Sequence, residues 1–323
     1  MIMTVKINTT SIYNKQPSVG IIIPTHNAHH HLKQCLSPIL ASPLKACVLI
    51  IDSSSKDGTV ELAQQMGIET KVIPKKEFNH GATRELARKH LNTDIVVMMT
   101  QDAYPQSSDF LQYLVAPLLE GKSSVAYARQ IPHKGADFFE AFPRQFNYLE
   151  KSHIRSIEDL ETYGSYTFFC SNSCAAWLNS ALDEIDGFFP VLTNEDTFAV
   201  AKLLNQGHHI AYVAEAVVHH SHRYSLLEEF KRYFDTGYTR RLYRDELFYG
   251  VRDEKHGSQF VKVMLKELIK KKPFLLSYAI LHISAKYLGY KVGNIGPKLP
   301  LKIARLLSGQ NFYWSSDYNI HKK

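Results

Sequence analysis

Short apolar runs alternate with amphipathic segments through the first hundred residues of the chain. Runs rich in β-branched residues predict strands at residues 19–23, 46–51, 71–73 and 95–100. Segments with helical spacing of apolar positions follow the first three runs. Strands that are apolar at nearly every position are typical of a parallel sheet buried on both faces. The pattern therefore predicts an α/β fold with a doubly wound, mostly parallel sheet and helices on both faces.

Beyond residue 120 the pattern is less regular. We expect strands at residues 125–129, 167–171, 209–213 and 216–218, and helices at residues 172–182 and 197–205. The segment 132–166 is aromatic and polar without a clear period, and both an amphipathic helix packed on the sheet and a mobile substrate loop fit it. The capping box Ser225-Leu-Leu-Glu228 predicts a long helix that ends near Tyr243.

Acidic and histidine side chains follow several of these elements. Asp52 and Asp102 stand where the second and fourth strands end, and ligands bind at the carboxyl ends of strands in open α/β sheets. A carboxylate there can hold a divalent cation, although Asp102 taken alone also fits a solvated turn. Glu195 and Asp196 open a helix, where the helix dipole by itself favours acidic residues. The consecutive residues 29–31, all His, cannot face one ion, because neighbouring side chains on a helix point in different directions.

The order of four motifs resembles glycosyltransferase family two, which has the GT-A fold. The motifs are Val19-Gly-Ile-Ile-Ile-Pro-Thr-His-Asn27, Ile50-Ile-Asp-Ser-Ser-Ser-Lys-Asp-Gly-Thr59, Gln101-Asp-Ala103 and Glu195-Asp196. Phe78-Asn-His-Gly-Ala-Thr-Arg84 and Thr100-Gln-Asp-Ala103 look most like rhamnosyltransferase-type members that build bacterial surface polysaccharides. The resemblance covers residues 18 to about 222 and implies a catalytic domain over 18–222, after a lead-in at 1–17 and before a helical region at 223–323.

The resemblance implies an inverting transfer of a sugar, with L-rhamnose expected, from a dTDP- or UDP-sugar donor. The acceptor would be a lipid-linked or growing cell-surface glycan. Asp196 would be the general base, and Asp102 would ligate Mg²⁺ or Mn²⁺ together with His220, with His222 as the reserve ligand. The donor-binding positions that it implies are Pro24, Thr25, Asn27, Asp52, Arg84, Gln101, Asp102 and Glu195.

The metal motif departs from the usual family pattern. Gln101-Asp102-Ala103 stands where Asp-X-Asp is usual, so at most one carboxylate remains for the ion. We therefore expect low metal affinity in the free enzyme, and a metal-independent variant stays open. The alternative function is a catalytically inactive, membrane-associated protein that binds nucleotide sugars as part of an assembly complex.

Charge is distributed unevenly along the chain. The net charge is +7, and residues 251–323 contain 14 Lys or Arg residues against 4 Asp or Glu residues. Basic residues beside aromatic and aliphatic ones in this tail suit a helix that lies on an anionic membrane surface. A C-terminal bundle with a solvated basic face is the alternative. No nucleic-acid-binding motif accompanies the charge, so nucleic acid is not an expected partner.

The expected location is the cytoplasm, at the inner face of the cell membrane. The four cysteines are too few and too scattered for a disulfide scaffold. The first residues lack the apolar core of a signal peptide. No apolar run approaches the ~20 residues that a membrane-spanning helix needs.

Overall fold

The computed structural model describes residues 17–244 and 254–319. Residues 1–16 of the predicted lead-in lie outside the described residues. The strands are β1 (Val19–Thr25), β2 (Cys47–Asp52), β3 (Glu69–Val72), β4 (Ile95–Met99), β5 (Tyr104–Pro105), β6 (Val125–Ile131), β7 (His153–Arg155), β8 (Cys174–Leu178) and β9 (Ile210–His219). They form one sheet in the order β3-β2-β1-β4-β8-β6-β9-β5, and β7 pairs with β9.

Helices cover both faces of the sheet. One face packs against α1 (His29–Leu40), α2 (Thr59–Gln65) and α4 (Phe110–Leu119), and the other against α3 (His80–Leu91), α7 (Asn179–Glu184) and α8 (Glu195–Asn205). Successive side chains of a strand point to opposite faces, so Ile22 and Met98 join one apolar cluster while Ile21 and Val97 join the other. The predicted α/β architecture is thus confirmed.

The sheet is mixed, because its second half contains antiparallel pairs. β1 pairs in parallel with both β2 and β4, whereas β8 lies antiparallel between β4 and β6. The predictions of a strand at 167–171 and a helix at 172–182 were wrong. A 3₁₀ turn (Gly164–Phe168) covers the start of the first segment, and residues 169–171 are irregular. In the second segment β8 takes residues 174–178, and only the last residues, from Asn179, are helical in α7. Cys174-Ala-Ala-Trp-Leu178 favours a helix locally, but insertion between two strands overrides that preference.

The two short strands predicted after residue 208 are one continuous strand, β9. Ala128 of β6 pairs with Val213, but the next residue, Arg129, pairs with Val217, so residues 214–216 of β9 form a bulge. β9 pairs with β6 on both sides of this bulge. The bulge explains why the apolar pattern breaks in the middle of the strand although the strand itself continues.

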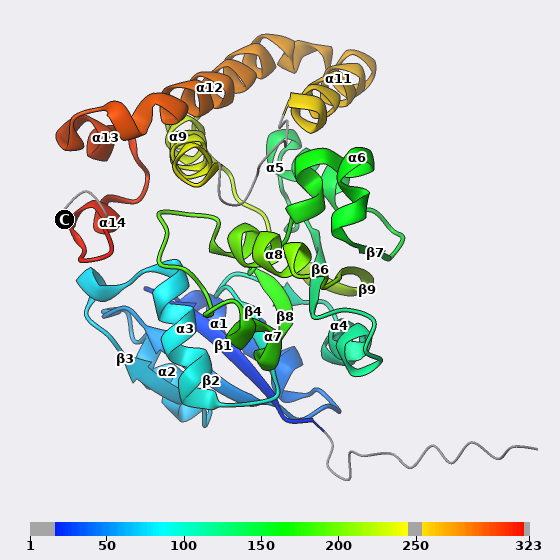
Figure 1. Cartoon of the computed structure of the whole chain (residues 1–323), viewed down its shortest axis with the longest axis vertical. Helices are drawn as coiled ribbons and strands as arrows, with labels where there is room; N and C mark the ends of the chain where they lie inside the picture. The colour runs from blue at the N-terminus through cyan, green and yellow to red at the C-terminus, as the bar shows by residue number, and fades with distance from the viewer. Residues whose placement is uncertain (1–16, 245–253, 320–323) are drawn as a thin grey trace, which may run out of the picture.

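The remaining helices are α5 (Phe138–Asn147), α6 (Leu160–Tyr163), α9 (Leu226–Leu242), α11 (Glu254–Lys271), α12 (Leu276–Ile295), α13 (Leu301–Leu307) and α14 (Asn311–Ser315). The capping box of Ser225 and Glu228 forms as predicted. The aromatic segment 132–166 contains a helix, α5, whose Phe142 packs against Met264 and Leu268 of α11. Figure 1 shows α11, α12 and α13 at the top of the molecule and the sheet in its lower half, with α9 below α12.

Candidate active site

The loops after β1 and β2 are held together around a buried carboxylate. Asp52 is fully buried, and its oxygens accept hydrogen bonds from the Thr25 hydroxyl at 2.8 Å and from the Ser55 backbone N–H at 2.8 Å. The side-chain oxygen of Asn27 accepts a hydrogen bond from the backbone N–H of Lys56 at 3.1 Å. The parallel pairing of Thr25 with Asp52 places these loops side by side. In this arrangement Asp52 organises the loops of the predicted nucleoside site.

Gln101 links the loop after β4 to the loop after β1. Its side-chain oxygen accepts a hydrogen bond from the His26 N–H at 2.8 Å, and its side-chain amide donates to the His26 carbonyl at 3.3 Å. A carboxylate could accept the first bond but could not donate the second. Gln101, which replaces the first acid of the usual metal motif, therefore has a defined role in joining the two loops.

Asp102 lies against two histidines from the far end of the domain. β5 pairs antiparallel with the end of β9, with Tyr104 opposite His219, and this pairing brings residue 102 beside the residues that follow β9. One carboxylate oxygen of Asp102 lies 3.6 Å from Nε2 of His220, and the other lies 3.4 Å from Nε2 of His222. The three side chains form a group whose ligand atoms lie within 4.8 Å of one another.

The surroundings of His220 prepare it to be a metal ligand. Its Nδ1 lies 2.9 Å from the Gln130 side-chain oxygen, so Nδ1 carries the proton and Nε2 keeps a lone pair directed toward Asp102. Burial lowers the pKa of His220 well below its usual value. The buried Nε2 has no hydrogen-bond partner within the described residues. One carboxylate and two imidazoles fit a divalent transition-metal ion better than Mg²⁺, which prefers an all-oxygen shell.

A buried ion pair fixes the start of α8. Nη1 of Arg84, on α3, donates to Oε1 of Glu195 at 2.7 Å, and both side chains are buried. Burial alone would raise the pKa of Glu195, but the Arg84 guanidinium outweighs it and leaves that pKa below its usual value. The two residues that the resemblance placed at the donor therefore bind each other in this structure. They hold the N-terminus of α8 against α3.

Asp196 follows Glu195 and is the acid whose environment suits proton transfer. Its oxygens accept hydrogen bonds from the backbone N–H groups of Asn172 at 3.0 Å and Thr197 at 2.7 Å. Burial, reinforced by the negative charge of Glu195, raises the pKa of Asp196 to about 7. A carboxyl group with that pKa is partly ionised at neutral pH and can exchange a proton in either direction.

Two positions that support the site were not predicted. The side chain of Asn172 donates to Glu195 at 3.2 Å while its backbone supports Asp196, and Gln130 orients His220. No sequence signal pointed to Asn172, because it lies within the segment predicted as helix. Gln130 falls at the end of a strand without any motif. His222, predicted as the reserve ligand, lies in the same group as His220 and Asp102.

Comparison with known proteins gives the family. A family model described as Glycosyl transferase family 2 matches residues 20–186. Over 306 residues, the chain is 40% identical to the O-antigen chain rhamnosyltransferase RfbN of Salmonella typhimurium, with 92% of this chain and 96% of that protein covered. The chain belongs to glycosyltransferase family 2. The glycosyltransferase is also 36% identical over 315 residues to the O-antigen chain rhamnosyltransferase WbaN of Salmonella anatum, covering 93% and 96% of the two chains.

A solved structure supports the GT-A architecture. The mannosyltransferase PcManGT of Pyrobaculum calidifontis, solved with GDP-Man and Mn²⁺, superposes with a TM-score of 0.57 over 96% of this chain and 89% of that chain. The sequence identity of the pair is 17%, so the similarity concerns the fold. The glycosyltransferase thus has the GT-A fold that its motifs predicted.

Proposed function

We propose that this glycosyltransferase moves an L-rhamnosyl group, with inversion, from a dTDP- or UDP-sugar to a growing or lipid-linked glycan of the cell surface. The observation that carries the proposal is the placement of Asp196 at the N-terminus of α8 with a pKa raised to about 7. The similarity to two O-antigen chain rhamnosyltransferases over nearly the whole chain supports the choice of sugar and acceptor class.

Asp196 would act on the acceptor. As the acceptor oxygen forms its bond to the anomeric carbon, its proton passes to the Asp196 carboxylate, and the bond from that carbon to the diphosphate oxygen breaks on the opposite face. The Arg84 and Glu195 pair, together with Asn172, holds the carboxylate at the position from which it can do this. These three are positioning residues in the proposal.

Asp102, His220 and His222 would hold the divalent cation, with Gln130 fixing the imidazole of His220. When bound, such an ion neutralises charge that develops on a leaving diphosphate. The mannosyltransferase of similar fold was solved with Mn²⁺, which supports the use of a divalent ion in the proposal. We expect Pro24, Thr25, Asn27 and the loop around Asp52 to contact the nucleoside, because these loops adjoin Gln101, the residue before Asp102.

The substitution Asp196→Asn tests the proposal. Loss of the general base should lower kcat by at least about a hundredfold. Binding of dTDP-L-rhamnose, measured by calorimetry, should be unchanged, because the donor would contact other residues. The wild-type kcat should fall as the pH drops below about 7, since protonation removes the base.

Asp186→Asn provides a matched control. Asp186 is an exposed Asp with a positive φ, a conformation that Asn also tolerates. It should retain full activity. An Asp196→Asn variant with the wild-type rate would remove Asp196 as the base, and a wild-type protein that binds the donor without turnover would favour the inactive, binding-only alternative.

We further propose that the C-terminal helices rest on the inner face of the cell membrane. Phe274, Leu281, Leu288 and Ile295 recur every seventh residue along α12 and the turn before it, and each is more than half exposed. Exposed basic residues lie at both ends of this stripe and on α13: Lys271, Lys272, Lys298, Lys302 and Arg305. Within residues 17–244 and 254–319, no helix has both the length and the apolarity to cross a bilayer. An apolar stripe flanked by cations suits binding at the surface of an anionic leaflet.

A further inference from the structure

A large cavity separates the catalytic domain from the C-terminal helices. Its volume is about 1560 Å³, and it is lined by α9, α11 and α12 on one side. On the other side, Asn194 and Thr197 line it, and these two residues flank the pair Glu195 and Asp196. The cavity therefore reaches the edge of the proposed base, and its volume exceeds that of a single sugar ring several times over.

Asp235 on α9 lies in the wall of this cavity and has one oxygen without a partner. Its Oδ2 accepts a hydrogen bond from the Gly309 backbone N–H at 2.9 Å. Its Oδ1 is buried and has no hydrogen-bond partner among the described residues. The side chain is 2% exposed, so bulk water does not compensate for the missing bond. Burial raises the pKa of Asp235 to about 7, although hydrogen bonds from the Ser308 side chain and the Gly309 backbone lower it. Leaving Oδ1 of this buried carboxyl group unpaired is costly, which points to a donor that arrives with a ligand.

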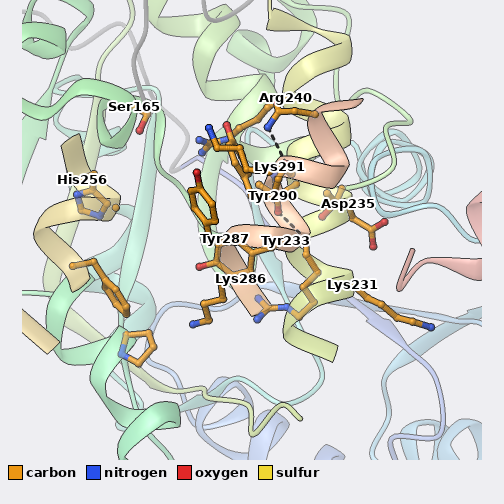
Figure 2. Close-up of a pocket in the computed structure, with 18 of the residues that line it drawn as sticks. Ser165, Lys231, Tyr233, Asp235, Arg240, His256, Lys286, Tyr287, Tyr290 and Lys291 are labelled. Atoms are coloured by element: carbon orange, nitrogen blue, oxygen red, sulfur yellow. Dashed lines mark hydrogen bonds between the residues drawn. The ribbon is translucent and has the colours of Figure 1, made fainter. Parts of the chain in front are cut away.

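The neighbours of Asp235 supply complementary groups. Lys231 precedes it by one helical turn and also lines the cavity, and Figure 2 shows both side chains extending from the same side of α9. Tyr233 and Tyr290 are among the aromatic residues of the cavity wall. A sugar hydroxyl both donates and accepts hydrogen bonds, so a carboxylate beside an ammonium group can satisfy adjacent hydroxyls. Aromatic rings supply apolar surface for the carbon-bound faces of sugar rings.

We propose that this cavity binds the acceptor glycan and that Oδ1 of Asp235 accepts a hydrogen bond from one of its hydroxyl groups, beside a contact from Lys231. The inference rests on the proposed transferase function and adds the acceptor site to it. Asp235 is a specificity-determining residue in this view. It binds the acceptor at a distance from the reacting atoms and does not take part in the proton transfer.

The substitution Asp235→Asn tests the inference. The amide oxygen can keep the bond from Gly309, while the amide nitrogen places a donor where the cavity had an acceptor. With dTDP-L-rhamnose as donor and a panel of p-nitrophenyl hexopyranosides as acceptors, the acceptor KM should rise by about threefold to tenfold, as expected for loss of one hydrogen bond. Donor hydrolysis and the melting temperature should stay at wild-type values.

Two further variants complete the experiment. Lys231→Met keeps the apolar stem of the side chain and removes the ammonium, so it should also raise the acceptor KM without changing donor hydrolysis. Asp317→Asn makes the same chemical change at an exposed Asp and should have no effect.

An unchanged acceptor KM in both cavity variants overturns the inference. A fall in melting temperature with equal losses of transfer and hydrolysis also overturns it, because Asp235 would then only anchor the Gly309 loop. Wild-type protein that neither hydrolyses nor transfers rhamnose would instead contradict the proposed function.

Discussion

Side chains from two distant parts of the chain meet at the candidate metal site, and the three side chains differ in their surroundings. His220 is buried and oriented by Gln130, whereas His222 is partly exposed and lies at the rim of a second cavity of about 1190 Å³. Asp102 lies between them. An ion bound here would depend on both imidazoles, because Ala103 leaves only one carboxylate in the motif.

The substitution His222→Asn should weaken Mn²⁺ binding with little cost to folding, because the His222 side chain is partly exposed. We expect the Mn²⁺ concentration for half-maximal transfer to rise by about tenfold or more, which is the scale seen when groups that orient metal ligands are lost. Titration of the metal-free protein with Mn²⁺, followed by transfer rates, measures this.

His208→Asn is the control for the metal experiment. His208 bonds Ser124 and Glu184 and is not in the Asp102 group, so its removal should leave the Mn²⁺ titration unchanged. If His222→Asn and wild-type proteins titrate alike, His222 is not a ligand. Activity that survives complete chelation would support the metal-independent variant that the motif left open.

At the scale of elements, close contact between two helices positions the acceptor cavity. α9 and α12 approach so closely that a Cβ added at Gly289 would clash with the Phe230 carbonyl oxygen, and one added at Gly293 would clash with the Phe234 carbonyl oxygen. Small residues permit this approach, and any larger side chain would force the helices apart. α9 carries Asp235 and Lys231, so the packing of α12 sets where these groups stand.

Gly289→Val should therefore destabilise the protein by about 1–3 kcal/mol, the usual range for overpacking. Equilibrium unfolding in urea measures the change. Gly257→Ala is the matched control, since a Cβ at Gly257 of α11 meets nothing within 4 Å. Ala is favoured over Gly in helices, so the control should be neutral or slightly stabilising. Equal stability of Gly289→Val and wild-type proteins would show that the helices do not pack this closely.

At the scale of the whole molecule, α12, which carries the exposed apolar stripe, lies at the opposite end of the molecule from strands β1 and β2 (Figure 1). A membrane at this end would leave the donor site open to solvent. The same end lies next to the acceptor cavity, because Tyr287 and Lys291 of α12 line that cavity. This arrangement suits an acceptor that is tethered to lipid.

The paired change Leu281→Ser and Leu288→Ser should reduce sedimentation with phosphatidylglycerol vesicles at low salt. High salt should release the wild-type protein, because the basic residues contribute through screened electrostatic attraction. Leu40→Ser alters an exposed leucine of α1 in the catalytic domain and should sediment as wild type. Wild-type protein that stays in the supernatant at low salt would contradict membrane binding.

The sequence by itself determined the elements whose signals are local. The β-branched runs of β1, β2 and β4, the capping box of Ser225 and the acids at the start of α8 all stand where the pattern predicted them. Such signals survive because a parallel strand is apolar along its length and a helix start is fixed by its own side chains. The order of the local motifs also led, through the family resemblance, to the prediction that Asp102 and Asp196 are site residues.

Only the tertiary structure decided what depends on distant neighbours. Residues 174–178 became a strand because β4 and β6 flank them, against their local preference. Elements far apart in sequence supply the partner of Arg84 and bring Asp102 close to both His220 and His222. The raised pKa of Asp196 has the same cause, because burial within the packed molecule is its main source. The unpartnered oxygen of Asp235 has the same origin, because burial and hydrogen-bond partners are properties of the packed molecule.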